Sequence, residues 1–309
     1  MKVLVTGGTN GMGKGVAKIL AGLDNQMHEV ILLCRSRELG EAAIKEFEAA
    51  TGNKKTSIIL CDLTKLSDVR IAIDEIQNKH QYLDGIFINA GLGYAAERVE
   101  TEDGMDPHFQ VNYLSQFMLT LNLLNLLENS EKGGRIIFNV TEGGKIFWDD
   151  MQMKNSWGYE KGITQAMVAK RMFYAKLHES YRNMKDSKVS FIGFQISKTV
   201  WSNQINIIPA SMRIMATVMK FFGTFISIEK CGMIMSPLFT ENQKESLKKS
   251  GKLITWKKNQ FTEVKEDESV FNRELQDRLW KVSLELCKDD KTTQIAEKLI
   301  IDRSDPPVK

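Results

Sequence analysis

Residues 6–14 read Thr6-Gly7-Gly8-Thr9-Asn10-Gly11-Met12-Gly13-Lys14, between the apolar run Val3-Leu4-Val5 and a helical pattern from Gly13 to Leu23. A glycine-rich turn between a buried strand and a helix is typical of a dinucleotide site, because its glycines let the backbone approach a pyrophosphate. The helix N-terminus adds unpaired N–H groups and a positive dipole end. An ordinary tight turn is the alternative. The turn residues expected to contact the cofactor are Gly7, Thr9, Asn10, Gly11, Met12 and Gly13.

Apolar runs of strand length alternate with helical patterns through the first two thirds of the chain. Strands buried on both faces and separated by helices predict right-handed parallel crossovers. Further strands are expected at residues 30–33, 57–61, 85–88, 135–140 and 189–194, and helices at 38–50, 66–80, 108–128, 164–182 and 271–287. No repeat or linker interrupts the chain. The sequence therefore predicts an α/β fold with a doubly wound parallel sheet of Rossmann type, as one domain over residues 1–309.

The end of the second strand bears on the choice between NAD(H) and NADP(H). An acidic residue there would hold the ribose hydroxyls, but the sequence is Cys34-Arg35-Ser36-Arg37, and the first acid is Glu38. A guanidinium is suited to a ribose phosphate, because its planar fork donates two hydrogen bonds. Arg35 and Ser36 are thus predicted to favour NADP(H) over NAD(H). A solvated arginine at a strand end is the alternative.

Composition argues against several other classes of protein. The net charge is +3 with basic and acidic residues interspersed, which disfavours a nucleic-acid surface. The four cysteines form no CxxC pair, and reduced thiols together with a strand starting at Lys2 predict a cytoplasmic protein without a secretory signal. No metal site is expected, because four scattered histidines lack ligand spacing. They are His28, His80, His108 and His178.

The pattern is weakest between residues 203 and 228, where a small helical substrate lid is expected. Its most lipid-like stretch runs from Ile207 to Ile228 and is interrupted by Arg213 and Lys220. A spanning helix needs about 20 nearly uncharged residues. The stretch therefore predicts an amphipathic lid or an interfacial helix and no membrane span. A homo-oligomer is also compatible with the sequence, since the long helices after the fourth and fifth strands form a dimer face or pack on the sheet.

Four segments resemble motifs of the short-chain dehydrogenase/reductase superfamily. Thr6 to Gly13 resembles its T-G-x-x-x-G-x-G turn, and Asn89-Ala90-Gly91 its N-A-G segment. Cys61-Asp62-Leu63-Thr64 resembles the D-L segment beside the adenine, and Phe109 to Leu114 the F-x-V-N-x-L that carries the structural asparagine, here Asn112. The resemblance implies that Asp62, Leu63, Asn89, Ala90 and Gly91 border the cofactor.

Within the superfamily the chain is similar to the retinol-dehydrogenase and protochlorophyllide-reductase-like branch. The likeness lies in Cys34-Arg35-Ser36, in Gly40-Glu41-Ala42-Ala43 and in the segment from Arg278 to Ser283. It covers nearly the whole chain and implies a small apolar substrate.

The catalytic pattern of the family, a Ser followed by Tyr-x-x-x-Lys, is not kept. There the Tyr exchanges a proton with the substrate, the Lys lowers the pKa of that Tyr, and the Ser orients the substrate. The Ser position falls on Thr141, whereas Ile163 and Met167 stand at the Tyr and Lys positions. Where the family has P-G-x-V-x-T, the chain has Ser197 to Ser202. Ser202 is expected to keep the hydroxyl near the carboxamide, and Lys198 is a candidate for the missing charge.

Two functions follow from this pattern. The first is an NADP(H)-dependent oxidoreductase acting on an apolar carbonyl, alcohol or conjugated enone with an atypical proton donor. Its catalytic candidates are Tyr159 as donor, Thr141 to orient the substrate, and Asn112 to hold a water or the helix kink. An ordinary half-exposed aromatic is the alternative for Tyr159. The second function is a catalytically inactive NADP(H)-binding pseudoenzyme that acts as a sensor or scaffold, as loss of both Tyr and Lys would produce.

Overall fold

The computed structural model describes residues 1–23, 28–182, 184 and 186–301, apart from the side chains at positions 203, 204, 300 and 301. Within these residues a sheet of eight strands has the order β10-β9-β6-β5-β4-β1-β2-β3. The strands are β1 (Lys2–Thr6), β2 (Glu29–Cys34), β3 (Thr56–Leu60), β4 (Gly85–Ile88), β5 (Arg135–Asn139), β6 (Ser190–Gln195), β9 (Leu253–Lys257) and β10 (Gln260–Glu263). All pair in parallel except β9 with β10. The doubly wound parallel sheet is confirmed.

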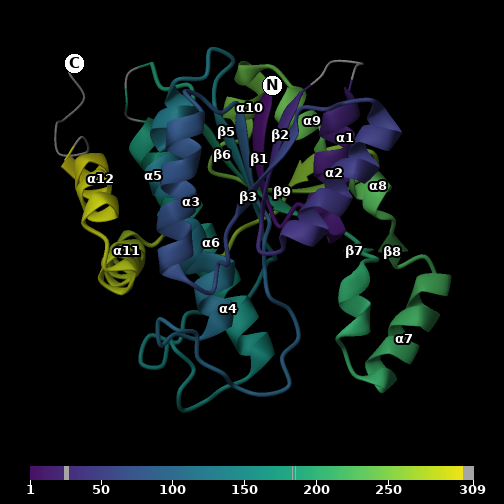
Figure 1. Ribbon diagram of the computed structural model, residues 1–309. Coiled ribbons are helices and arrows are strands. Elements are labelled where there is room, and N and C mark those ends of the chain that lie inside the picture. Colours follow the sequence, from purple (N-terminus) through teal and green to yellow (C-terminus); the bar gives the residue numbers. More distant parts are fainter. Residues whose placement is uncertain (24–27, 183, 185, 302–309) are drawn as a thin grey trace.

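Helices cover both faces of the sheet (Figure 1). One face carries α3 (Leu66–Lys79), α5 (Ser115–Glu128), α6 (Tyr159–Arg182), α11 (Arg273–Cys287) and α12 (Asp290–Ile301), and the other carries α1 (Gly11–Gly22), α2 (Arg37–Thr51), α8 (Ile228–Met235) and α9 (Pro237–Thr240). A further helix, α10 (Gln243–Lys249), packs beside the start of β6 through the hydroxyl pair Ser246–Ser190. Each helix layer packs on one face of the sheet and forms an apolar core with it, so both faces of the central strands are buried.

The helix expected over residues 108–128 is interrupted. The structure has a short α4 (Pro107–Phe109), a π-helical turn η2 (Gln110–Leu114) and then α5. Asp106 caps the start by accepting a hydrogen bond from the N–H of Phe109 at 2.9 Å. A π turn inserts an extra residue into helical spacing and is frequent at functional sites. Here it turns Asn112 toward the loop after β4.

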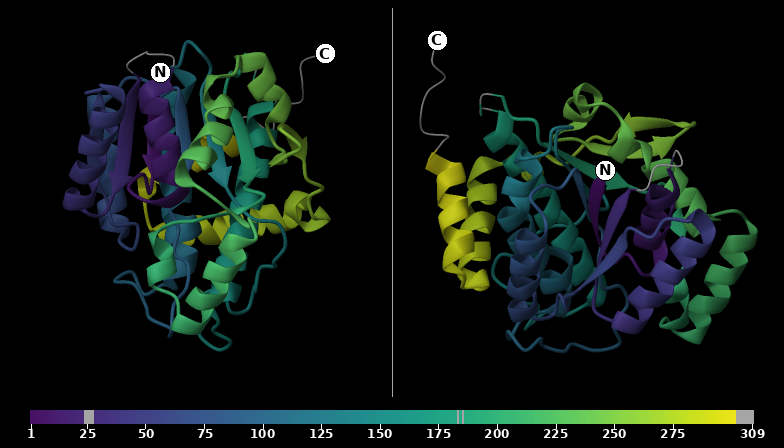
Figure 2. Two further views of the ribbon diagram at one scale, coloured as in Figure 1. Left: turned by 90° about the vertical axis from the view of Figure 1, so that its right-hand side faces the viewer. Right: turned by 45° about the horizontal axis from the view of Figure 1, so that its top comes forward.

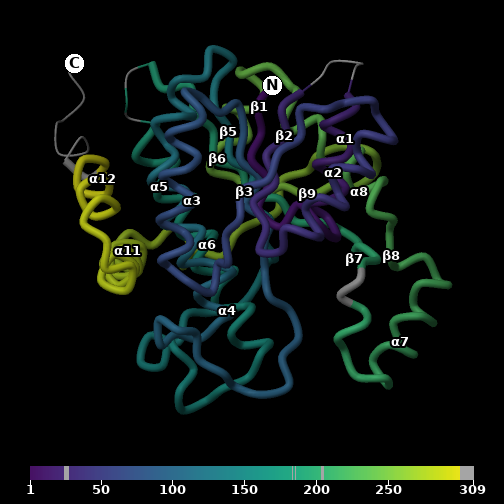
Figure 3. Tube along the Cα trace, in the orientation of Figure 1, coloured from purple at the N-terminus to yellow at the C-terminus, as the bar shows by residue number. Residues whose placement is uncertain are grey.

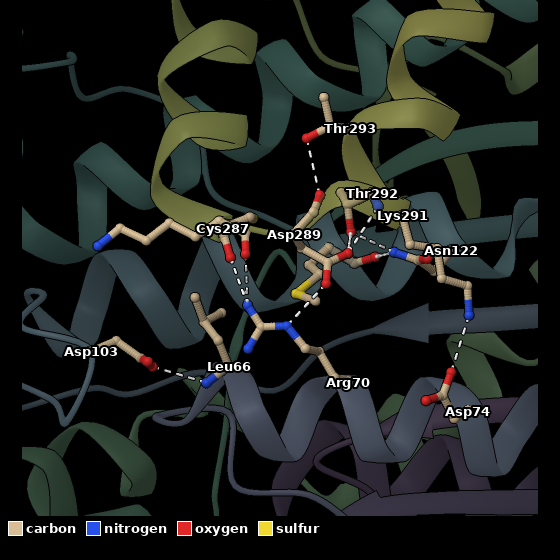
Figure 4. Close-up of polar contacts among 12 residues, drawn as sticks. Leu66, Arg70, Asp74, Asp103, Asn122, Cys287, Asp289, Lys291, Thr292 and Thr293 are labelled. Atoms are coloured by element: carbon tan, nitrogen blue, oxygen red, sulfur yellow. Dashed lines mark hydrogen bonds and ion pairs between the residues drawn. The ribbon is translucent and has the colours of Figure 1, made fainter.

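The C-terminal elements include structure that the sequence pattern did not predict. β9 and β10 form a hairpin whose turn residues, Lys258 and Asn259, have φ values of 51° and 60°. A second closing helix, α12, follows α11 and docks on α3 and α5 (Figure 4). Arg70 of α3 donates to the Asp289 carboxylate at 3.0 Å and to the Cys287 carbonyl at 2.8 Å.

The segment expected as a lid forms an arm that stands away from the sheet (Figures 2 and 3). We call residues 199–227 the arm. It consists of the short parallel strands β7 (Thr199–Val200) and β8 (Phe225–Ile226), a 3-10 turn η3 (Asn203–Asn206) and the helix α7 (Ala210–Phe221). No helix in the described part of the chain is long and apolar enough to cross a membrane.

Arg70→Ala should lower the free energy of unfolding by about 1–2 kcal/mol, because it removes charge-assisted hydrogen bonds that dock the C-terminal helices. Urea denaturation measures the change, and hydrogen exchange should show faster exchange within α12. Lys291→Ala is the control, because its ion pair with Asp74 is exposed and should contribute less than about 0.5 kcal/mol. Equal effects of the two variants would contradict this account of the docking.

Candidate dinucleotide site

The glycine turn joins the C-terminal end of β1 to α1, and at Gly13 it has room for backbone only. Gly7 has a φ of +68°, in the left-handed region that favours glycine. A Cβ built on Gly13 would lie 2.4 Å from the Gly7 carbonyl oxygen and 2.6 Å from the side-chain nitrogen of Asn89. The first turn of α1 therefore packs directly on the turn and on the end of β4, which leaves the helix N-terminus facing the edge of the sheet.

Asn10 begins α1 as its N-cap and accepts a hydrogen bond from the Gly11 N–H at 2.8 Å. The first turn of α1 contains no acidic residue. The N-terminal end of the helix dipole is thus not neutralised by a local carboxylate, which suits it to an anion such as a diphosphate. Ser202, at the base of the arm, lies beside this turn, with its Cβ 3.5 Å from the position of a Cβ on Gly11.

Thr6 ties the glycine turn to the Asn89-Ala90-Gly91 segment. Its hydroxyl oxygen accepts hydrogen bonds from the backbone N–H groups of Asn89 and Ala90, both at 2.9 Å. The same hydroxyl donates to the Phe87 carbonyl at 3.2 Å. The side-chain amide of Asn89 returns a hydrogen bond to the Thr6 carbonyl at 3.1 Å. Two of the sequence motifs therefore form one rigid unit at the carboxyl ends of β1 and β4.

The end of β2 presents an exposed guanidinium. Arg35 is exposed and makes no hydrogen bond or ion pair with the residues that the structure describes. Ser36, the N-cap of α2, accepts a hydrogen bond from the Leu39 N–H at 3.2 Å and so begins the helix directly after the arginine. Arg37 lies 4.0 Å from the carboxylate of Glu41 and already has a partner. Arg35 is therefore free to bind a phosphate without breaking an ion pair among these residues.

Asp62 and Leu63 follow β3 at the same edge of the sheet. The Asp62 carboxylate accepts hydrogen bonds from the Thr64 N–H at 3.0 Å and the Thr64 hydroxyl at 2.8 Å. Leu63 is buried, and its carbonyl accepts a hydrogen bond from the Ser115 hydroxyl at 2.7 Å. This loop is held in place by its own polar groups and by Ser115 of α5.

Asn112 lies in the π-helical turn and is fully buried. Its side chain accepts a hydrogen bond from the Leu92 N–H at 2.6 Å and donates to the Leu92 carbonyl at 3.1 Å. The Asn112 side chain thus ties the interrupted helix to the loop that follows Gly91.

The two remaining catalytic candidates lie on exposed or half-buried parts of the same edge. Thr141 is exposed just after β5. Tyr159 begins α6, where its hydroxyl donates to the Glu160 carboxylate at 3.1 Å and its ring packs on Tyr94 with centroids 5.0 Å apart. Partial desolvation and the hydrogen bond to Glu160 raise the pKa of Tyr159 above its usual value. This is the opposite of the change that the family's lysine produces in its tyrosine.

Lys170 is a buried titratable group of the region, and a shifted alignment of this helix, onto Ala166 and Lys170, places it at the family's Lys position without a matching Tyr. It lies on α6 three residues after Met167, and its ammonium donates to the backbone carbonyl of Asn139, at the end of β5, at 3.1 Å. The Asn139 amide in turn donates to the Asn89 side chain at 3.3 Å. Lys170 is 2% exposed, and within the described ranges no carboxylate pairs with it. Burial lowers its pKa from 10.5 to about 7.

Lys198, the other basic candidate, points elsewhere. Its ammonium donates to the Gly223 carbonyl of the arm at 2.6 Å. No group of three or more His, Cys, Asp or Glu side chains in the described residues is arranged to hold a metal ion.

The first 152 residues match the family model described as short chain dehydrogenase. The N-terminal half of the chain therefore matches the short-chain dehydrogenase family. It is similar to polyprenol dehydrogenase of Danio rerio, at 34% identity over 182 residues, which are 57% of this chain and 55% of that protein. It is also similar to retinol dehydrogenase 11 of Homo sapiens, at 32% over 157 residues, which are 47% and 48% of the two chains. The matches span about half the length of these relatives and support the retinol-dehydrogenase-like branch.

Solved structures share the fold over more of the chain. An uncharacterised protein from Mycobacterium Paratuberculosis superposes with a TM-score of 0.65 at 18% identity, over 93% of both chains. NADPH-bound carbonyl reductase from chicken fatty liver superposes with a TM-score of 0.59 at 18% identity, over 82% of this chain and 96% of that one. At this identity the likeness establishes the fold.

Lys170→Met should raise the free energy of unfolding at neutral pH and flatten its dependence on pH. The pKa of Lys170 is about 7 when folded and near its ordinary value of 10.5 when unfolded, so between these values the unfolded chain binds more protons. Stability of the unsubstituted protein therefore rises with pH across that window, and methionine removes this contribution.

Urea denaturation at a series of pH values between the two pKa values tests this expectation. Lys161→Met is the control, because Lys161 lies on the exposed side of the same helix and donates to the Ser156 carbonyl. If Lys170→Met and the control had the same pH dependence, Lys170 would not be a buried uncompensated amine.

Proposed function

We propose that this protein binds NADP(H) and acts as an oxidoreductase on an apolar carbonyl, alcohol or conjugated enone, with an atypical proton donor. One observation carries the cofactor choice: Arg35, directly after β2 and beside the glycine turn, is exposed and has no partner among the residues that the structure describes. The NADPH in the chicken liver carbonyl reductase and the NADP in a Pseudomonas aeruginosa RhlG complex support the same choice. The names of the polyprenol and retinol dehydrogenase relatives support an apolar substrate.

The residues at the carboxyl edge of the sheet would each contact a different part of the dinucleotide. The N–H groups at the start of α1, from Gly11 to Gly13, face the diphosphate. Arg35 and Ser36 take the ribose phosphate, Asp62 and Leu63 border the adenine, and the segment from Asn89 to Gly91 borders the next ribose. Ser202 is beside the diphosphate turn. The bound nicotinamide would supply or accept the hydride, so the protein mainly supplies geometry.

The proton must come from a group other than the family's tyrosine, because the side chains of Ile163 and Met167 carry no acidic hydrogen. Tyr159 and Thr141 are two candidates. Lys170 is a third, since a buried amine with a pKa near 7 exchanges a proton readily at neutral pH. Reduction of a conjugated C=C bond would tolerate this arrangement best, because water can deliver its proton.

The alternative is a pseudoenzyme that binds NADP(H) without turnover. Ile163 and Met167 favour it, and so does Tyr159, whose raised pKa and hydrogen bond to Glu160 suit it poorly to proton transfer. The dinucleotide turn would bind the diphosphate through backbone N–H groups, so binding does not depend on the catalytic side chains.

Arg35→Ala should weaken NADPH binding about 10- to 100-fold and leave NADH binding nearly unchanged, because it removes the partner of the ribose phosphate alone. Isothermal titration calorimetry with both nucleotides measures the effect. Arg37→Ala is the matched control, since its guanidinium is paired with Glu41. Failure of the unsubstituted protein to take up NADPH or NADH would remove the proposal altogether, and equal losses for both nucleotides would remove the assignment of Arg35.

Turnover separates the enzyme from the pseudoenzyme. We expect oxidation of NADPH in the presence of an enone, a quinone or a retinal-like aldehyde, and a rate lowered at least about tenfold by Thr141→Ala or Tyr159→Phe. If Lys170 holds the proton, Lys170→Met should remove an ionisation near neutral pH from the pH profile of kcat. Tight NADPH binding without turnover across the panel would support the pseudoenzyme.

A further inference from the structure

The loop that follows β5, residues 141–146, has one polar anchor to the rest of the described fold. Its first five residues are exposed, and Ile146 packs against the apolar core only at its far end. Among the described residues this loop makes a single hydrogen bond, which the Gly143 carbonyl accepts from the Arg171 guanidinium at 2.6 Å. Arg171 is therefore the polar group that fixes the loop, two residues after Thr141.

Arg171 is itself held by a buried ion pair. It lies on α6 and is 1% exposed, and its other terminal nitrogen lies 3.3 Å from the carboxylate of Glu266. The Glu266 side chain is buried as well. It lies between β10 and the 3-10 turn η4 (Glu268–Phe271), whose Val270 is in the core. Although 95 positions separate Arg171 from Glu266, the ion pair joins the C-terminal segment to the loop after β5.

Stability alone does not explain this ion pair. The desolvation of two charges offsets most of their attraction, and apolar residues of similar volume often serve as well in such a place. Desolvation is incompletely compensated here, because Nε of Arg171 and Oε1 of Glu266 are buried without a hydrogen-bond partner among the described residues. An apolar pair could fill the same volume, but it could not bond the Gly143 carbonyl. The hydrogen bond to the loop is what distinguishes the ion pair from an apolar pair.

We propose that Arg171 is a positioning residue for the substrate site: with the support of Glu266 it holds the Gly143 carbonyl and thereby sets the place of Thr141. Thr141 stands at the position of the family's serine, which orients the substrate, so this inference rests on the proposed function. Arg171 lies one turn of α6 beyond Met167, on the same face of the helix. Its terminal nitrogens are already bonded to Gly143 and Glu266, so it acts through the loop.

The order of the loop tests the positioning without cofactor or substrate. The double variant Arg171→Met, Glu266→Leu keeps the buried volume filled, so the fold should persist while the bond to Gly143 is lost. We expect the backbone order parameter of Gly143, measured by NMR relaxation, to fall from about 0.85 to below about 0.6. The control double variant Lys252→Met, Glu263→Leu removes an exposed ion pair of the β9–β10 hairpin and should leave this order parameter unchanged.

A second variant, Arg171→Lys, serves if the double variant does not fold. An ammonium can pair with Glu266, but it lacks the planar fork that reaches both Glu266 and Gly143. The loop should therefore lose order while the ion pair and the fold are kept. An order parameter of Gly143 that stays at the value of the unsubstituted protein would overturn the proposal.

Kinetics distinguish positioning from a general effect on packing. With the enones and aldehydes named above, the double variant Arg171→Met, Glu266→Leu should lower kcat/KM at least about tenfold, but by less than about twofold in a Thr141→Ala background, because residues that act through one another are not additive. Its affinity for NADPH should stay within about twofold of the unsubstituted value, since the predicted cofactor contacts lie on other loops.

Fully additive losses of kcat/KM would overturn the positioning through Thr141. Absence of turnover in the unsubstituted protein would instead remove the enzyme proposed above. In that case the order parameter of Gly143 would still decide whether Arg171 holds the loop, so the two failures are distinguishable.

Discussion

The dinucleotide edge depends on one constraint, the hydrogen bonds of the Thr6 hydroxyl. That oxygen holds the backbone of Asn89 and Ala90, while Asn89 returns a bond to the Thr6 carbonyl. The ends of β1 and β4 are thereby fixed to each other within hydrogen-bond distance. Only then can Gly13 approach the Gly7 carbonyl so closely that a Cβ would lie 2.4 Å from it. The direction of α1, and with it the anion site, follows from this contact between two strand ends.

The parts of this arrangement that the sequence predicted are those with a local cause. Continuous apolar runs predicted the parallel strands because such strands are buried on both faces, and glycine spacing predicted the turn because side chains cannot fit there. The π turn was missed, since the local pattern is helical and the interruption depends on Asn112 bonding to Leu92, which lies 20 positions earlier. α12 was missed for a similar reason, because its docking depends on Arg70 and Asn122 from distant helices.

Lys170 shows a second limit of motif reading. Aligning α6 to the family identifies Ile163 and Met167 as replacements, but it gives no indication that a lysine three residues later reaches back to the end of β5. A buried ammonium without a carboxylate is costly, so some constraint of packing or of function must keep it. A basic residue inside an otherwise apolar helix face was the available signal. Its meaning required the distance to Asn139, which depends on how the helix sits on the sheet.

The two halves of the site make different demands on the chain. Holding a dinucleotide needs backbone N–H groups, glycines and one guanidinium, whereas moving a proton needs a particular side chain at a particular atom. Substitutions on α6 can therefore remove the family's tyrosine and lysine without disturbing Thr6 or the turn. The arm meets a third demand, because the apolar side chains of α7, none of which is buried, are unfavourable in water unless something covers them.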